Sequence, residues 1–406
     1  MKEKITIIDN TTILNRYVDK WSQADYITVD TEFIREKTYW PQLCLIQIGG
    51  PEESVIIDPQ AKGIELSKLF SLLNSSSVLK VFHAARQDIE LFYHLTGKIP
   101  QPLFDTQIAA AVCGFGDSVG YEKLANKLAG EKIDKTLRFT DWARRPLTEQ
   151  QLNYALSDVS HLRVVFEKLD AQLSASGRRA WLDQDMDNLT NTNIYEMPPS
   201  SAWKRIKTRG GNKRFYGVLR EIAAWRENEA KSRNLPRGHV VRDEALIEIA
   251  AQKPLNVKEL NGIRALTKRT AEGKFGESLI QCVNRALNLA ENKLPSPPPR
   301  KETPPGIGPI VDLLKVLLKS QCEKSGVAQR IVANTNDLER IASLSNDVIE
   351  ESIKDIPALN GWRRNIFGEL ALALKMGRIS LTATKGRIHI ISLDNIKLKP
   401  PTSYED

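Results

Sequence analysis

The 406-residue sequence has few cysteines and histidines and no long hydrophobic run. Its cysteines include no closely spaced pair, which argues against a zinc site or a disulfide framework and favours a reducing compartment. No segment approaches the roughly 20 apolar residues that a membrane span needs. Asp9 interrupts the start of the chain before any apolar core of signal-peptide length. We therefore expect a cytoplasmic protein with no membrane partner.

The sequence also lacks the GxxxxGK[ST] pattern that cradles nucleotide phosphates. This absence excludes an ATP-driven motor of the P-loop type, and we expect no nucleotide cofactor. Three of the five histidines, His83, His94 and His161, show no metal-ligand spacing among themselves. We interpret them as packing residues or as neighbours of a functional site.

Charge is distributed unevenly along the chain, whose formal net charge is +8. Residues 1–200 hold 22 basic and 27 acidic residues, whereas residues 201–300 hold 21 and 10. Residues 301–406 are nearly balanced, with 15 and 13. An excess of +11 in one region predicts a polyanionic partner there, although a solvated basic surface is the simpler alternative.

The first half of the chain predicts an α/β fold. Short β-rich runs at 26–30, 43–48 and 54–58 indicate an antiparallel or mixed sheet, and a buried strand follows at 78–82. Helical patterns occupy 64–73, the segment from Asp88 to Leu95, and most of 103–185. We predict a sheet flanked by helices, ending near residue 200.

The second half predicts two helical modules on either side of a linker. Amphipathic stretches fill 207–292 and 310–378. Between them, residues 295–309 contain seven of the 20 prolines, which is typical of an extended spacer, so we assign a linker to 293–309. The tail at 379–406 mixes β-branched and basic residues and fits neither module.

Four carboxylates lie where acidic residues are unusual. Asp30 ends an apolar strand and Glu32 follows two residues later, so both face the same side of that strand. Asp88 lies near a helix start, where, taken alone, an ordinary helix-dipole contact is the better interpretation. Tyr154 and Asp158 share one face of a helix that the Thr148/Gln151 spacing predicts to begin near 148. For this pair alone, a structural hydrogen bond is the safer interpretation.

Taken together, the four acids predict a metal site. Ligand sets made only of oxygen select hard cations such as Mg²⁺ or Mn²⁺. Phosphoryl transfer benefits from two such ions roughly 3.5–4 Å apart, which clamp the attacking and leaving oxygens. A tyrosine hydroxyl nearby would hold the attacking water.

The same segments resemble a known family. Residues 28–33 (TVDTEF), 82–88 (FHAARQD) and 154–158 (YALSD) resemble, in order, the three motifs of the DEDD 3′→5′ exonucleases. The Tyr-x-x-x-Asp spacing is that of the tyrosine subgroup, because position 153 is Asn where the histidine subgroup has His. Residues 104–106 and 141–147 resemble further segments of the ribonuclease D family, and 235–246 resembles an HRDC domain.

The resemblance implies a ribonuclease H-like exonuclease domain at 1–200, followed by HRDC domains at 207–292 and 310–378. It implies that Asp30, Glu32, Asp88 and Asp158 bind two divalent cations, with Asp30 bridging them, and that Tyr154 orients the attacking water. The implied reaction removes nucleoside 5′-monophosphates from RNA with a single-stranded 3′ end, in tRNA precursors and other small structured RNAs. We expect a monomer.

Candidate RNA contacts are harder to select. Phe33 and Trp40 would stack on terminal bases, although core packing explains Phe33 equally well. Arg138, Arg144 and Arg145 would hold phosphates, or form a solvated loop. In the first helical module the candidates are basic residues: Lys213, Arg214, Arg233, Arg237, Arg242, Lys268 and Arg269.

Two other functions are compatible with these residues. One is a 3′→5′ exonuclease acting on DNA, because metal ligands do not select the sugar. The other is a nucleic-acid-binding scaffold whose nuclease site has decayed. The presence of all four motif acids argues against decay.

Overall fold

The computed structural model describes residues 5–133, 136–137, 140–297, 304, 306–345 and 353–393. Within these ranges the chain forms two compact units. The first comprises residues 1–104, 134–160 and 187–300, and the second comprises 105–133, 161–186 and 301–406. Helix α6 (Glu149–Ala175) begins in the first unit and continues into the second. None of the described helices combines the length and the apolar character needed to cross a membrane.

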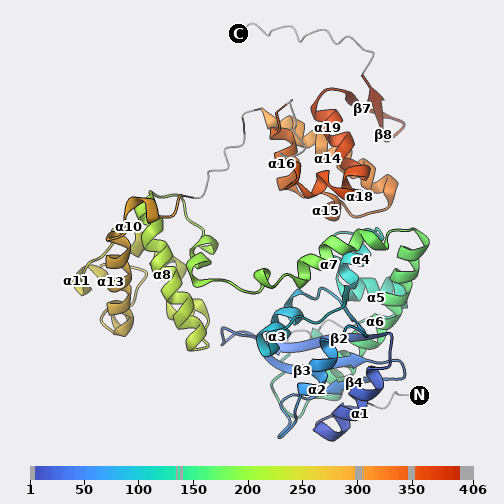
Figure 1. The fold of residues 1–406 in the computed structure, drawn as a ribbon, viewed down its shortest axis with the longest axis horizontal. Helices are drawn as coiled ribbons and strands as arrows, with labels where there is room; N and C mark the ends of the chain where they lie inside the picture. Colours follow the sequence, from blue (N-terminus) through green and yellow to red (C-terminus); the bar gives the residue numbers. More distant parts are fainter. Residues whose placement is uncertain are drawn as a thin grey trace. The chain divides into compact units, whose positions relative to one another are not determined.

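A mixed six-stranded sheet organises the N-terminal region, as the sequence predicts (Figure 1). Its spatial order is β1-β4-β3-β2-β5-β6. Central strand β2 pairs antiparallel with β3 and parallel with β5. The strands are β1 (Ile7–Ile8), β2 (Tyr26–Ile34), β3 (Gln42–Gly49), β4 (Ser54–Ile57), β5 (Leu79–Phe82) and β6 (Leu103–Asp105). The sequence patterns missed β1 and β6 because runs of two or three residues are too short to show alternation.

Three helices accompany this sheet in the first unit: α1 (Thr11–Trp21), α2 (Ser67–Leu73) and α3 (Arg86–Thr96). Helix α3 begins two residues before the expected Asp88 and ends at Gly97, whose φ of 69° is left-handed. Glycine adopts this conformation without the steric cost that a Cβ imposes, so it terminates the helix. Asp88 therefore lies in the first turn of α3 and is buried.

The first helical module packs around its own apolar core, also in the first unit. Leu219, Ile222, Leu279 and Val283 have no exposed surface. Longer helices α8 (Lys213–Ser232) and α13 (Lys274–Leu287) supply these residues. The remaining elements are η3 (Thr192–Ile194), η4 (Pro199–Arg205), α9 (Arg237–Val240), α10 (Asp243–Gln252), α11 (Val257–Leu260), α12 (Lys268–Ala271) and η5 (Glu291–Lys293).

The connection between β2 and β3 attaches to this module. Tyr39 is buried and donates a hydrogen bond to the Glu227 carboxylate. Arg237 donates to the same carboxylate over 2.6 Å and to the Tyr39 hydroxyl over 2.8 Å. Burial would raise the pKa of Glu227, but hydrogen bonds from Arg237 and Tyr39 outweigh it and lower the pKa. A fully buried carboxylate thus stays ionised and joins sequence-distant segments.

The second unit is mainly helical. Its elements are α4 (Thr106–Val112), α5 (Tyr121–Ala129), η2 (Arg179–Leu182), α14 (Ile307–Ser325), α15 (Gln329–Val332), α16 (Thr335–Ser343), η6 (Pro357–Leu359), α18 (Gly361–Arg363), a π-helical turn η7 (Arg364–Gly368) and α19 (Glu369–Lys375). Helix α7 (Asp183–Thr190) starts in this unit and continues into the first. The sequence prediction of a second helical module is confirmed here.

The second module packs on helices η2 and α7 of the same unit. The rings of Trp181 and Trp362 stack 4.5 Å apart, and the Trp362 indole donates to the Trp181 carbonyl. Arg363 is buried and donates to Gln184 and to Asp185. The module is therefore held to these helices by specific contacts.

Two boundaries differ from the sequence expectation. Helix α14 begins at Ile307, inside the expected linker. Pro309 does not prevent this start, because it lies in the first turn of the helix, where no backbone N–H is needed. Residues 298–303 and 305 of that linker lie outside the described ranges. In the tail, β7 (Ile379–Thr384) and β8 (Arg387–Ser392) form an antiparallel hairpin, which accounts for the β-branched residues there. Residues 394–406 are not described.

Candidate active site

Strand β2 places two carboxylates side by side. Thr28, Asp30 and Glu32 share one face of the strand because alternate residues point the same way. A bulge between Glu32 and Phe33 then interrupts the pairing with β3. Thr31 points to the opposite face, and its hydroxyl donates a hydrogen bond to the Asp88 carboxylate.

Helix α6 brings the third carboxylate to this face. The expected capping box is present: Gln151 accepts from the Thr148 backbone over 2.9 Å, and Thr148 accepts from the Gln151 backbone over 3.2 Å. The buried side of the helix carries Ala155, Val159 and Leu162. The Val159 carbonyl accepts a 2.8 Å hydrogen bond from Thr28. This bond anchors α6 to β2 one residue beyond Asp158.

Gly49 in β3 makes this close approach possible. A Cβ at this position would lie 2.2 Å from the Thr28 hydroxyl and 2.9 Å from the Val159 carbonyl. Any larger side chain would therefore push the helix away from the strand. Neither Gly49 nor Thr28 was singled out from the sequence, because only the strand register shows that they face α6.

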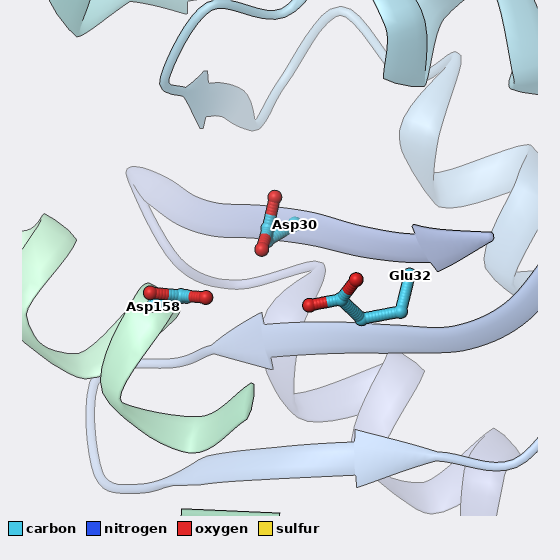
Figure 2. Close-up of side chains that lie close together, drawn as sticks. All are labelled: Asp30, Glu32 and Asp158. Carbon is cyan, nitrogen blue, oxygen red and sulfur yellow. The ribbon is translucent and has the colours of Figure 1, made fainter. Parts of the chain in front are cut away.

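The carboxylates of Asp30, Glu32 and Asp158 converge (Figure 2). One carboxylate oxygen of each lies within 4.8 Å of those of the other two. Asp158 accepts a hydrogen bond from Tyr154, yet its Oδ1 atom is buried and has no protein partner. Asp88 is not part of this group of three. It lies instead against Thr31, between the two β2 acids in sequence.

Burial and mutual repulsion perturb the acids. Burial raises the pKa of Asp30 from 3.8 to about 6. Burial, followed by the charge of Asp30, raises the pKa of Asp158 well above its ordinary value. Burial and the neighbouring carboxylates also raise the pKa of Tyr154, so its hydroxyl stays protonated at neutral pH. Clustered carboxylates with an unpartnered buried oxygen fit a hard divalent cation, whose charge would offset these costs.

Gln47 is a neighbour that the sequence did not reveal. It lies directly opposite Asp30 in the β2–β3 pair and has no exposed surface. Neither its amide nitrogen nor its amide oxygen has a protein hydrogen-bond partner. Directly opposed residues share a face of the sheet, so this amide lies beside the carboxylate cluster.

The structure separates the candidate phosphate contacts into two groups. Arg145 is bound within the protein, to Asp58 at 2.7 and 2.8 Å and to the Cys44 carbonyl at 2.9 Å. Arg144 is exposed, and Phe33 is half-buried at the bulge. Arg138 lies outside the described residues.

The same separation holds in the first helical module. Arg214 donates to three carbonyls at the end of α13, and Arg237 belongs to the Tyr39–Glu227–Arg237 network. Both guanidinium groups are therefore bound within the protein and stabilise the fold. The other candidates are more accessible, some with surface ion pairs: Lys213, Arg233, Arg242, Lys268 and Arg269.

Trp40 also differs from its expected position. Its ring stacks on His94 at 3.9 Å with an interplanar angle of 9°, and its backbone N–H donates to Asn234 over 3.1 Å. It packs on the core of the first helical module rather than beside the carboxylates.

Comparison with known proteins agrees with this geometry. Residues 5–174 match the family described as 3′-5′ exonuclease, and residues 216–283 match the HRDC domain. Exonucleases of the DEDD family depend on divalent metal ions, which suits the carboxylate cluster.

Full-length relatives match nearly the whole chain. Ribonuclease D of Bartonella henselae is 44% identical over 94% of this chain and 93% of its own. Ribonuclease D of Nitrobacter hamburgensis is 45% identical over 94% of this chain and 98% of its own. The crystal structure of Escherichia coli RNase D, titled an exoribonuclease involved in structured RNA processing, superposes with a TM-score of 0.76 at 30% identity, covering 91% and 98% of the two chains. The chain therefore belongs to the ribonuclease D family of 3′→5′ exoribonucleases.

Proposed function

We propose that this enzyme trims the 3′ ends of tRNA precursors and other small structured RNAs in the cytoplasm, releasing nucleoside 5′-monophosphates. The observation that carries the proposal is the convergence of Asp30, Glu32 and Asp158 around the unpartnered Oδ1 atom. The description of the E. coli enzyme as acting in structured RNA processing supports the substrate class.

We propose that two divalent cations, Mg²⁺ or Mn²⁺, bind Asp30, Glu32, Asp158 and Asp88. When bound, they would neutralise the developing negative charge of the phosphodiester and lower the barrier to attack by water. Asp88 is included because its segment lies within the part of the chain that matches the 3′-5′ exonuclease family, although its hydrogen bond to Thr31 is on the opposite face of β2. The donors are all hard oxygens, as such ions require.

Tyr154 has a separate role in this proposal. Its hydroxyl, held by Asp158 and protonated at neutral pH, orients the attacking water without acting as the base. Hydrogen-bond orientation of a nucleophile needs a positioned donor or acceptor within reach, and the Thr28–Val159 hydrogen bond anchors α6 close to Tyr154.

RNA binding outside the catalytic site is assigned to the first helical module, whose region carries the charge excess of +11. Of the sequence candidates in this module, we retain those whose side chains remain accessible: Lys213, Arg233, Arg242, Lys268 and Arg269. In the N-terminal region we retain Phe33 and Arg144 on the same ground. The Arg242→Ala/Arg269→Ala variant tests this assignment. Removing two phosphate contacts should make the slope of log affinity against log salt concentration shallower by about 1.4 for a single strand. An unchanged slope would contradict a role of this module in RNA binding. We further propose that the second module is an HRDC domain, that the enzyme is monomeric and that it needs no nucleotide cofactor.

One assay tests the substrate proposal. A tRNA precursor with extra 3′ nucleotides and a single-stranded DNA of equal length are incubated with the enzyme and Mg²⁺. We expect stepwise release of 5′-mononucleotides from the RNA and slow or no release from the DNA. Equal or faster hydrolysis of the DNA would contradict the RNA specificity, and products with 3′-phosphates would contradict the mechanism.

A further inference from the structure

A cleft of about 820 Å³ lies within the first unit, where α3, the β2–β3 connection and segment 194–199 meet α8. Its volume falls within the roughly 300–1,000 Å³ of typical ligand sites. Two of its walls come from the elements that carry the catalytic acids. Arg35 directly follows β2, and α3 places Asp88 between the lining residues Arg86 and Glu90. The cleft therefore shares β2 and α3 with the candidate active site, although the catalytic carboxylates do not line it.

The cleft carries an excess of positive charge. Two acidic side chains line it, Glu90 and Glu196. Glu90 already accepts two 2.8 Å hydrogen bonds from Arg35, and Glu196 accepts one from Tyr93. The basic side chains that line it are Arg35, Arg86, Arg205, Lys231 and Arg237.

Two of these cations are left for a ligand. Arg237 is already paired with the buried Glu227, and Lys231 donates to the Met197 carbonyl over 3.2 Å. Arg86 and Arg205 are exposed and form no ion pair with any carboxylate in the described ranges. Two unneutralised guanidinium groups at one cleft favour an anionic occupant, and guanidinium groups bind phosphates well.

Aromatic rings line the same cleft. The Trp40–His94 stack forms part of the wall, and the Tyr93 and Tyr195 rings lie 6.1 Å apart. Aromatic side chains beside a cationic groove are typical of sites for single-stranded nucleic acid, because every base offers a face for stacking.

We propose that this cleft binds a single-stranded RNA segment upstream of the 3′ end, with Arg86 and Arg205 contacting phosphates and Tyr93 and Tyr195 contacting bases. The proposal rests on the function proposed above and extends it: the nucleotides beyond the scissile bond are held between the nuclease and the first helical module. The cleft therefore discriminates between substrates by their length and not by the chemistry of the terminal nucleotide.

The test compares wild-type enzyme with the Arg86→Ala/Arg205→Ala variant on single-stranded RNAs of about 2 to 16 nucleotides, a range that spans known single-strand site sizes. For the dinucleotide we expect unchanged kcat/KM. For the longest RNA we expect kcat/KM to fall about tenfold at 0.15 M salt, and the salt slope to become shallower by about 1.4, since each single-strand phosphate contact contributes about 0.7. Arg205→Ala alone, remote from the catalytic acids in sequence, should give about a fourfold fall.

The matched control is Arg16→Ala/Lys62→Ala, which removes the same charge from exposed positions outside the cleft. If this control lowers long-RNA activity as much as the cleft variant does, the effect is a general charge effect and the proposal fails. It also fails if the cleft variant matches wild type on long RNA, or loses the same factor on the dinucleotide. RNA binding measured by fluorescence anisotropy requires no hydrolysis, so it tests the cleft even if wild-type enzyme releases no product, the result that would refute the proposed function.

Discussion

Removing the Asp30 charge should stabilise the metal-free protein. Burial raises the pKa of Asp30 from 3.8 to about 6, so the folded state binds a proton more tightly than the unfolded state does. Below about pH 4, Asp30 is mostly neutral in both states and its charge does not affect the free energy of unfolding. As the pH rises through 6, the folded state must carry the buried charge, so the free energy of unfolding falls. About two pKa units correspond to at most about 3 kcal/mol, and relaxation of the site reduces this to roughly 1–3 kcal/mol at pH 7.5.

The assay is the melting temperature of Asp30→Asn and wild type in EDTA between pH 4 and 8. A gain of 1–3 kcal/mol corresponds to an increase of about 2–12 °C at pH 7.5, shrinking towards zero at pH 4. Saturating Mg²⁺ should narrow or reverse the difference, because the ion stabilises only an intact site. Asp25→Asn, at an exposed carboxylate, is the control. If Asp30→Asn melts at or below the wild-type temperature in EDTA at pH 7.5, the electrostatic account of the cluster is wrong.

Three further substitutions test the surroundings of the cluster. Tyr154→Phe should lower kcat about 10²-fold with little change in KM or melting temperature, because it removes only the orienting hydroxyl; a kcat near wild type would refute that role. Gly49→Ala should cost about 1–3 kcal/mol of stability and reduce kcat by displacing α6, whereas Gly120→Ala, whose Cβ would contact nothing within 4 Å, should do neither. Gln47→Leu should preserve or raise the melting temperature, since it removes an unpartnered buried amide. It should lower kcat, because the amide lies opposite Asp30; an unchanged kcat would show that the amide does not contribute to catalysis.

The carboxylates were predictable from sequence because their geometry is local. Asp30 and Glu32 are alternate residues of a strand, and Tyr154 and Asp158 are one turn apart on a helix, so their faces follow from periodicity. Their convergence required tertiary information. The Thr28–Val159 hydrogen bond and the space left by Gly49 depend on strand register and helix docking, which no local pattern encodes.

The basic residues were harder to interpret because a paired and a free arginine look alike in a sequence. Arg145 meets Asp58, 87 positions away, and the buried Glu227 occupies Arg237. Conversely, no sequence pattern distinguishes Arg86 and Arg205, which the structure leaves exposed at the same cleft. Pairing across the fold, rather than local charge density, decides which cations are available to RNA.

The most direct test of the account is Mg²⁺-dependent release of 5′-mononucleotides from a 3′-extended tRNA by Asp158→Asn beside wild type. The substitution replaces one oxygen of the cluster with an amide nitrogen and preserves side-chain shape, so far-UV circular dichroism should be unchanged. We expect release by the variant to be abolished while wild type trims the RNA. A folded Asp158→Asn enzyme that hydrolyses at the wild-type rate would show that these carboxylates are not the catalytic site.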